Sequence, residues 1–173
     1  MIWLLACATP EPVEDPGSPA DTGGALPCVP SSPIVVFATR HAEKEDTGDD
    51  PGLTEEGLAR AEALAERMRD EPLAAIYATD LVRTQQTVAP TAADHDLSVI
   101  VVPDLDAEDV LAATLCATHA GETVLHAGHS YTLPDFAEAL GAEPVLVDGY
   151  GQLWTITVGT DGVAAVVEER YGA

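Results

Sequence analysis

The sequence predicts an α/β fold, a three-layer α/β/α sandwich with a mainly parallel sheet and a C-terminal β-hairpin. From residue 33 onward, short apolar runs alternate with segments of helical periodicity, which is typical of parallel strands joined by helices. The first apolar run would be apolar on both faces, as in a strand buried between two layers. The last segment has no helical pattern and instead holds two strand-like runs around a turn.

The first predicted strand is PIVVFAT, residues 33–39, whose Val, Ile and Phe residues favour a buried strand. A helix is expected from about residue 55 to residue 70. Thr54 can cap its first turn and Pro72 stops it. Its apolar positions at helical spacing are Leu58, Ala61, Leu64, Ala65 and Met68.

The remaining elements follow the same alternation. The run LAAIYAT, residues 73–79, is predicted as the second strand, and Asp80 as the cap of a helix that reaches Val88 and is kinked at Pro90. Further strands are expected at residues 97–102 and 122–128, further helices at 107–118 and 133–140, and a hairpin from GQLWTITV and VAAVVEERY around GTDG.

Composition narrows the classes of partner. The chain of 173 residues has 7 basic and 30 acidic residues, a net charge of −23, and is the size of one domain. Such a charge repels nucleic acid and anionic membrane surfaces, so neither is an expected partner. No apolar run of about 18 residues is present that could span a bilayer. The acidity is interpreted as a means of solubility or adaptation to salt.

The chain divides into three parts. Residues 1–7, MIWLLAC, resemble a truncated lipoprotein signal in which Cys7 would be lipidated, although the basic start of a normal signal is missing. A trimmed signal and a chance match are both compatible with this, and the first is favoured. Residues 8–32, rich in Pro and acids, are predicted to be a disordered linker, and residues 33–173 the folded domain. The expected location is the bacterial cell envelope or periplasm, or else the cytoplasm.

The two other cysteines form an even pair once Cys7 is set aside. In an oxidising compartment Cys28 and Cys116 could form a disulfide. The alternative is two unrelated buried thiols, and sequence separation alone does not decide between them.

Positively charged and imidazole side chains follow three of the predicted strands. Arg40 and His41 end the first strand, Arg83 lies one helical turn after the second, and His129 follows the fourth. Ligands bind at the carboxyl ends of the strands in such sheets, so these groups are expected at one edge. The alternative is that the arginines pair with some of the 30 acids.

This set of residues suits phosphoryl transfer. Guanidinium groups bind phosphate oxygens in a bidentate manner and stay charged, and fixed cations stabilise the transition state. A neutral imidazole can attack phosphorus, and nearby arginines keep its pKa low enough for that. The histidines show no metal-ligand spacing. The sequence therefore predicts a reaction that uses neither a metal ion nor another cofactor.

Four ordered motifs in residues 33–171 resemble those of the histidine phosphatase superfamily, the phosphoglycerate mutase-like proteins. They are TRHAEK, LTEEGLARAEALAERM, YATDLVRTQQT and LHAGHSYTL. The resemblance implies a compact metal-independent phosphatase that acts on a phosphomonoester or phosphoprotein. His41 would be the nucleophile that becomes phosphohistidine, and Arg40, Arg83 and His129 would bind the phosphate. Ala42 departs from the usual Gly, and its methyl group could crowd the backbone beside the phosphate.

The proton donor is expected in PDLDAEDV, which offers Asp104, Asp106 and Glu108. Asp106 and Glu108 are the preferred candidates. Glu43 and Lys44 lie close to the nucleophile in sequence, and each could equally be a loop residue that faces solvent.

The other histidines are given structural roles. His126 is expected to be a packed side chain on the opposite side of its strand from His129, and His95 and His119 are expected to be surface residues or helix caps.

Two other functions compete with the phosphatase. GHSYT is close to a nucleophile elbow with Ser130, but no histidine follows it in the order that α/β-hydrolases use. The second is a non-catalytic phosphate- or partner-binding domain of the same fold.

Overall fold

The computed structural model describes residues 28–104 and 108–172 of the chain. The predicted signal with Cys7, most of the predicted linker and the candidate acid Asp106 therefore lie outside the described residues. None of the helices in the described part is long and apolar enough to cross a membrane.

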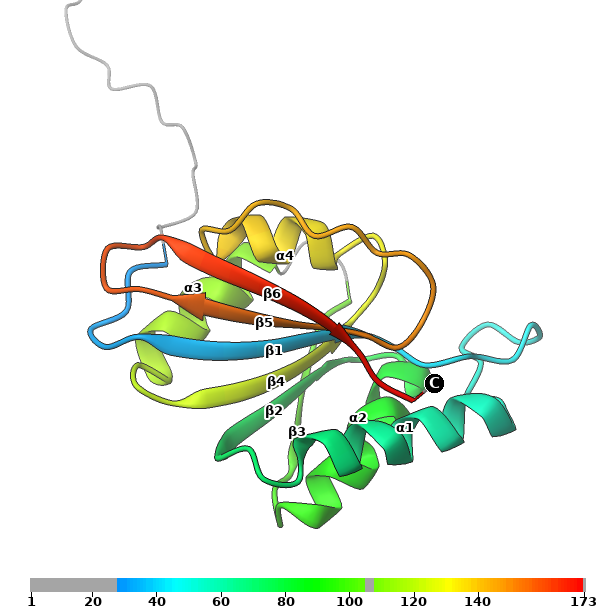
Figure 1. The fold of residues 1–173 in the computed structure, drawn as a ribbon. Helices are drawn as coiled ribbons and strands as arrows, with labels where there is room; N and C mark the ends of the chain where they lie inside the picture. The colour runs from blue at the N-terminus through cyan, green and yellow to red at the C-terminus, as the bar shows by residue number, and fades with distance from the viewer. Residues whose placement is uncertain (1–27, 105–107, 173) are drawn as a thin grey trace, which may run out of the picture.

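A single six-stranded sheet in the order β3-β2-β4-β1-β5-β6 forms the middle layer (Figure 1). The strands are β1 (Ile34–Arg40), β2 (Leu73–Thr79), β3 (Val99–Val102), β4 (Thr123–Gly128), β5 (Gln152–Val158) and β6 (Ala164–Arg170). The four strands from β3 to β1 are parallel, and β5 and β6 are antiparallel to their neighbours. The predicted mainly parallel sheet and the C-terminal hairpin are both confirmed.

Four helices cover the two faces of the sheet: α1 (Glu55–Met68), α2 (Val82–Asp94), α3 (Glu108–Thr118) and α4 (Leu133–Ala139). Figure 1 shows α1 and α2 on one side and α3 and α4 on the other. Each side has its own apolar core. Leu64, Met68 and Val88 pack on Phe37 and Ile76, whereas the other core unites Leu115 and Phe136 with Trp154 and Val124. The three-layer α/β/α architecture is as predicted.

Helix α1 begins as its sequence predicts. Thr54 has an extended backbone, and its hydroxyl accepts a hydrogen bond from the backbone N–H of Gly57 at 3.1 Å. The predicted core positions of this helix are buried, except Leu58, which is 49% exposed. The helix ends at Met68, two residues before the predicted end.

The cap of α2 differs from the prediction. Leu81, not Asp80, is the N-cap residue, and its side chain makes no capping hydrogen bond. The carboxylate of Asp50, a residue far away in sequence, instead accepts from the backbone N–H of Val82 at 3.1 Å. Pro90 lies inside the helix, which continues to Asp94. The cap was missed because it comes from a loop that only the tertiary fold brings to this helix.

A disulfide joins Cys28 to Cys116, with their Cα atoms 5.5 Å apart. It links the segment before β1 to α3, and both residues are buried in the same apolar core as Leu115. The cross-link closes a loop across 88 residues of sequence, and a long closed loop restricts the unfolded chain strongly.

Candidate active site

The carboxyl ends of three parallel strands lie together and carry the polar residues of the candidate site. Arg40 at the end of β1 is in register with Gly128 at the end of β4, and Ala78 near the end of β2 is in register with Ala127. The backbone N–H of His41 also donates to the carbonyl of Gly128 at 3.0 Å. The structure therefore brings Arg40, His41, Arg83 and His129 to one edge of the sheet, as the motif spacing predicts.

His41 is buried, with 3% of its surface exposed. Its Nδ1 lies 2.7 Å from the backbone carbonyl of Ala42, so that nitrogen carries the proton and donates it. The other nitrogen, Nε2, consequently keeps its lone pair. Burial is the main cause that lowers the pKa of His41 to about 4, and the charge of Arg40 adds to the shift. At neutral pH His41 is therefore an uncharged imidazole with a free Nε2.

The second histidine, His129, lies close to the first, with the two ring centroids 5.3 Å apart. Its Nε2 is 2.8 Å from the hydroxyl of Thr79 and 2.8 Å from the carboxylate of Asp104. Burial, followed by the charges of the two site arginines, lowers its pKa to about 4. Its Nδ1 is buried and has no hydrogen-bond partner within the described residues.

The two arginines also present unsatisfied donors. The Nε atoms of both Arg40 and Arg83 are buried and have no hydrogen-bond partner in the described part of the chain. Arg40 is held by a hydrogen bond from Nη1 to the carbonyl of Gly149 at 3.2 Å, and Arg83 faces the carboxylate of Asp50 at 3.7 Å. Two guanidinium groups with such donors at one edge of the sheet suit the binding of an anion.

Of the three acids considered as proton donor, Asp104 contacts the site directly. Its carboxylate lies against His129 and accepts hydrogen bonds from the hydroxyl of Tyr131 at 2.8 and 2.9 Å. Tyr131 also stacks on the His129 ring, with centroids 5.0 Å apart and an interplanar angle of 8°. Glu108 lines a recess beside the site, and Asp106 lies outside the described residues. Of the described acids, Asp104 contacts His129 and Glu108 lies in the neighbouring recess, and the preference for Asp106 stays a prediction.

Two tyrosines of the site were missed by the sequence analysis. The ring of Tyr150, in the loop between α4 and β5, lies under the guanidinium of Arg40 at 4.3 Å and 5.8 Å from the His41 ring. Tyr131 follows the GHS motif directly, so its position could have been found from that motif. Tyr150 has no comparable signal, because its loop reaches the site only through the path of the chain after α4.

The segment after the nucleophile is fixed by α1. Glu43 accepts from Arg60 Nε at 2.8 Å through both carboxylate oxygens, and the backbone N–H of Thr54 donates to the carbonyl of Glu43. A side chain at Gly57 would collide with that same carbonyl, which explains the glycine in LTEEG. Glu43 is thus an ion-pair partner within the fold rather than a solvent-facing loop acid.

Ala42 is completely buried, and its N–H donates to the hydroxyl of Thr87 at 2.9 Å. Its methyl group packs with Leu53 and Ala61 in a small cluster, so it is accommodated beside α1.

The remaining residues considered from the sequence lie as follows. The Nζ of Lys44 donates to the carbonyl of Glu45. His95 caps α2, and its Nε2 lies 3.0 Å from the carbonyl of Met68. His119 is not a simple surface residue, because it links the hydroxyl of Tyr77 at 2.8 Å to a neighbouring carboxylate. Among the described residues, no group of three or more potential metal ligands is close enough to hold an ion.

A comparison with protein families finds a match for the segment that contains Arg40, His41 and Arg83. Residues 36–111 match the family described as the histidine phosphatase superfamily (branch 1). This segment of the chain is similar to the histidine phosphatase superfamily. The match takes in the strand that delivers Arg40 and His41 and the helix that carries Arg83, while His129 lies beyond it.

Two curated relatives of this chain come from strains of Mycobacterium tuberculosis, the uncharacterized proteins Rv0525 and MT0547. Each is 40% identical over 77 residues, which is 40% of this chain and 38% of the relative. The matched segment thus spans little more than a third of the length of these relatives.

Solved structures support the fold. The protein histidine phosphatase SixA complexed with tungstate has a TM-score of 0.67 at 19% identity and covers 80% of this chain and 97% of its own. The mycobacterial glucosyl-3-phosphoglycerate phosphatase Rv2419c has a TM-score of 0.63 at 15% identity, covering 82% and 99%. Phosphoglycerate mutase from Bacillus anthracis has a TM-score of 0.64 at 15% identity, covering 83% and 95%.

Proposed function

We propose that this domain is a metal-independent phosphatase that hydrolyses a phosphomonoester or a phosphoprotein through a phosphohistidine intermediate on His41. One observation carries the proposal. A neutral imidazole with a free Nε2 lies among buried polar atoms without partners, contributed by Arg40, Arg83 and His129. This combination provides both a nucleophile for phosphorus and donors for phosphate oxygens.

In the first step, the lone pair of His41 Nε2 attacks phosphorus while the bond between phosphorus and the leaving oxygen breaks. The guanidinium groups of Arg40 and Arg83 stabilise the charge on the phosphoryl oxygens. His129 donates a hydrogen bond to them from Nδ1 in the tautomer whose Nε2 accepts from the hydroxyl of Thr79. The proton stays on Nδ1 and is donated to the carbonyl of Ala42, which holds the ring in its reactive orientation and stabilises the positive charge that the ring acquires.

The leaving oxygen needs a proton, and Asp104 is the acid placed to supply it. Its carboxylate lies 2.8 Å from His129, on the edge of the phosphate site, and this position is what supports the assignment. In the second step, water gives a proton back to the Asp104 carboxylate and attacks phosphorus. The bond from phosphorus to His41 breaks, and its electron pair returns to Nε2.

The similar proteins agree with phosphate-ester chemistry, since two of them are named as phosphatases and one as a mutase. We favour hydrolysis over mutase activity, because a domain of this size leaves little room for segments that shield an intermediate from water. The substrate would be a phosphorylated small molecule or a phosphoprotein.

We also propose that the protein is anchored in the cell envelope through lipidated Cys7. The lipobox-like LLAC and the Pro-rich segment after it support this, and a disulfide between Cys28 and Cys116 is compatible with an oxidising compartment. Labelling with radioactive palmitate tests the anchor: label should enter the wild type and be absent from Cys7→Ser. Label in both proteins, or in neither, would contradict it.

A non-catalytic binding domain would use the same phosphate site without turnover, and a serine hydrolase would use Ser130. Ser130 is exposed, and its side chain makes no hydrogen bond to a histidine within the described residues. The test is hydrolysis of 4-nitrophenyl phosphate by the wild type, His41→Ala and Ser130→Ala in excess EDTA. Activity should survive EDTA and Ser130→Ala and vanish in His41→Ala. No activity in the wild type, or equal activity in His41→Ala, would reject the phosphatase.

A further inference from the structure

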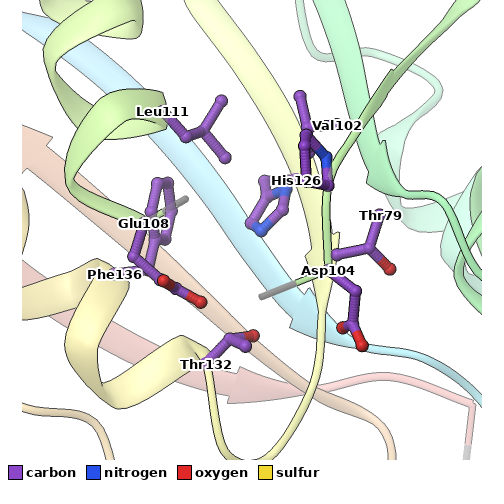
Figure 2. A pocket seen from close by; sticks show the side chains of 9 residues that line it. Thr79, Val102, Asp104, Glu108, Leu111, His126, Thr132 and Phe136 are labelled. Atoms are coloured by element: carbon purple, nitrogen blue, oxygen red, sulfur yellow. The ribbon is translucent and has the colours of Figure 1, made fainter. Parts of the chain in front are cut away.

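A recess lies beside the phosphate site, on the face of the sheet that α3 and α4 cover (Figure 2). It is lined by the ends of β2, β3 and β4 and by side chains of both helices, among them Glu108, Leu111 and Phe136. The free space in the recess, including the part open to solvent, is about 250 Å³.

His126 lies in the middle of this recess. Figure 2 shows its imidazole between Phe136 and Leu111 on one side and Thr79 on the other. The residue is only 3% exposed, packs on Phe136 with ring centroids 4.7 Å apart, and its Nδ1 has no hydrogen-bond partner in the described part of the chain. Burial lowers its pKa to about 3, so it is uncharged at neutral pH. His126 therefore offers an uncharged imidazole, which can form a hydrogen bond with a polar group in the recess.

The charges around the recess have one sign. Two acids line it, Asp104 and Glu108, and Figure 2 shows them on opposite sides of His126. All seven Lys and Arg residues of the chain lie in its described part, and none of them lines the recess. A second anion brought here would meet two carboxylates and no cation, whereas a hydrogen-bond donor or a cation would be stabilised.

Asp104, the proposed proton donor, belongs both to the phosphate site and to this recess. It touches His129 of the phosphate site and also lines the recess. An acid that protonates the leaving oxygen must lie on the side where the leaving group departs. The recess is therefore next to the leaving group of any substrate whose phosphate lies against the two histidines.

We propose that this recess is the leaving-group subsite, and that it selects phosphate esters whose leaving group carries a hydroxyl or ammonium group and no second anion. This inference rests on the proposed phosphatase activity. The imidazole of His126 forms a hydrogen bond with the polar group of the leaving group, and Glu108 repels leaving groups that carry a carboxylate or a further phosphate.

The test compares kcat/KM for four monoesters of primary alcohols: propyl phosphate, glycerol phosphate, ethanolamine phosphate and 3-phosphoglycerate. Salt of about 0.5 M shortens the screening length to about 4 Å, so that the net charge of the chain contributes little. The wild type should prefer glycerol and ethanolamine phosphate over 3-phosphoglycerate by at least about tenfold. It should also prefer glycerol phosphate over propyl phosphate, which lacks the polar group.

Two variants separate the contribution of the Glu108 charge from that of the His126 hydrogen bond. Glu108→Gln should improve 3-phosphoglycerate relative to glycerol phosphate by at least about threefold, because one repelling charge is removed. His126→Leu should lower kcat/KM for glycerol phosphate by about tenfold while propyl phosphate stays within about twofold. Glu62→Gln, at an exposed position of α1 on the other face of the sheet, removes the same charge far from the recess and should change neither ratio.

Hydrolysis of 4-nitrophenyl phosphate distinguishes a failure of the phosphatase proposal from a failure of the subsite proposal. If the wild type does not hydrolyse it in a manner that depends on His41, both the phosphatase and the subsite are rejected. If it does, but 3-phosphoglycerate and glycerol phosphate react equally well, only the subsite is rejected. Equal responses of Glu108→Gln and Glu62→Gln would also reject the subsite, because the effect would then come from overall charge. Unchanged selectivity in both Glu108→Gln and His126→Leu would do the same.

Discussion

Replacing His126 with Gln should make the protein less sensitive to acid. In the folded state, burial and then the nearby His129 lower the pKa of His126 from 6.5 to about 3. The unfolded chain therefore binds a proton at His126 as the pH falls below about 6.5, while the folded protein does not. The free energy of unfolding therefore decreases progressively as the pH falls from about 6.5 towards about 3. Above about pH 6.5 this contribution to stability is retained in full.

The size of the effect follows from the two pKa values. Between about pH 7.5 and pH 5, a group whose pKa falls from 6.5 to about 3 on folding costs about 2 kcal/mol of unfolding free energy. Gln does not titrate and is close to His in size, so His126→Gln should lose about 2 kcal/mol less than the wild type over this range. Asp104, Glu108 and His129 remain in both proteins, so their own titrations largely cancel in the difference.

The assay is urea unfolding at the two pH values, followed by tryptophan fluorescence, since Trp154 is buried in the core. The quantity compared is the change in unfolding free energy with pH, which removes any constant cost of the substitution. If both proteins lost the same free energy between the two pH values, His126 would not be held neutral by burial, and its described environment would be wrong.

Three further predictions concern the site and its support. Arg83→Lys should lower kcat/KM for 4-nitrophenyl phosphate by about 100-fold, because an ammonium cannot bind two phosphate oxygens as a fork does; a loss below about threefold would contradict this role. Asp104→Asn should lower kcat/KM about 100-fold for an alkyl phosphate but under about tenfold for 4-nitrophenyl phosphate, whose leaving group needs little protonation. The reverse pattern, or the same pattern in Asp106→Asn instead of Asp104→Asn, would show that Asp104 is not the proton donor. Arg60→Gln should lower the free energy of unfolding in urea by about 2 kcal/mol, because Glu43 is left half-buried and unpaired. Adding Glu43→Gln should restore part of that free energy. A double variant less stable than the single variant would contradict the ion pair.

Periodicity in the sequence was enough to place the layers of the fold. The run from Ile34 to Ala38 is apolar because β1 is covered on both faces, and the helical spacing of Leu64 and Met68 reflects the single face that α1 buries. Local capping was predictable at Thr54, where donor and acceptor are three residues apart. It was not predictable at α2, because the capping carboxylate of Asp50 comes from a separate loop.

The same distinction applies to the site. Residues that end strands could be assigned to one edge, since parallel strands share a direction, and this placed His41 and His129 together. Contacts made by loops could not be assigned in this way. Asp104 reaches His129, and Tyr150 reaches Arg40, through the course of loops that no local pattern describes. The acid-rich composition made the choice among neighbouring carboxylates harder still, because 30 acids are available and few of them touch the site.

The central claim is that His41 forms a covalent phosphohistidine. The most direct measurement mixes the protein with a radioactive phosphate ester, quenches it with alkali, in which phosphohistidine survives, and maps the labelled residue by mass spectrometry. Label should appear on His41 on the timescale of one turnover, and none should appear in His41→Ala. Label on another residue, or turnover without any labelled protein in the wild type, would contradict it.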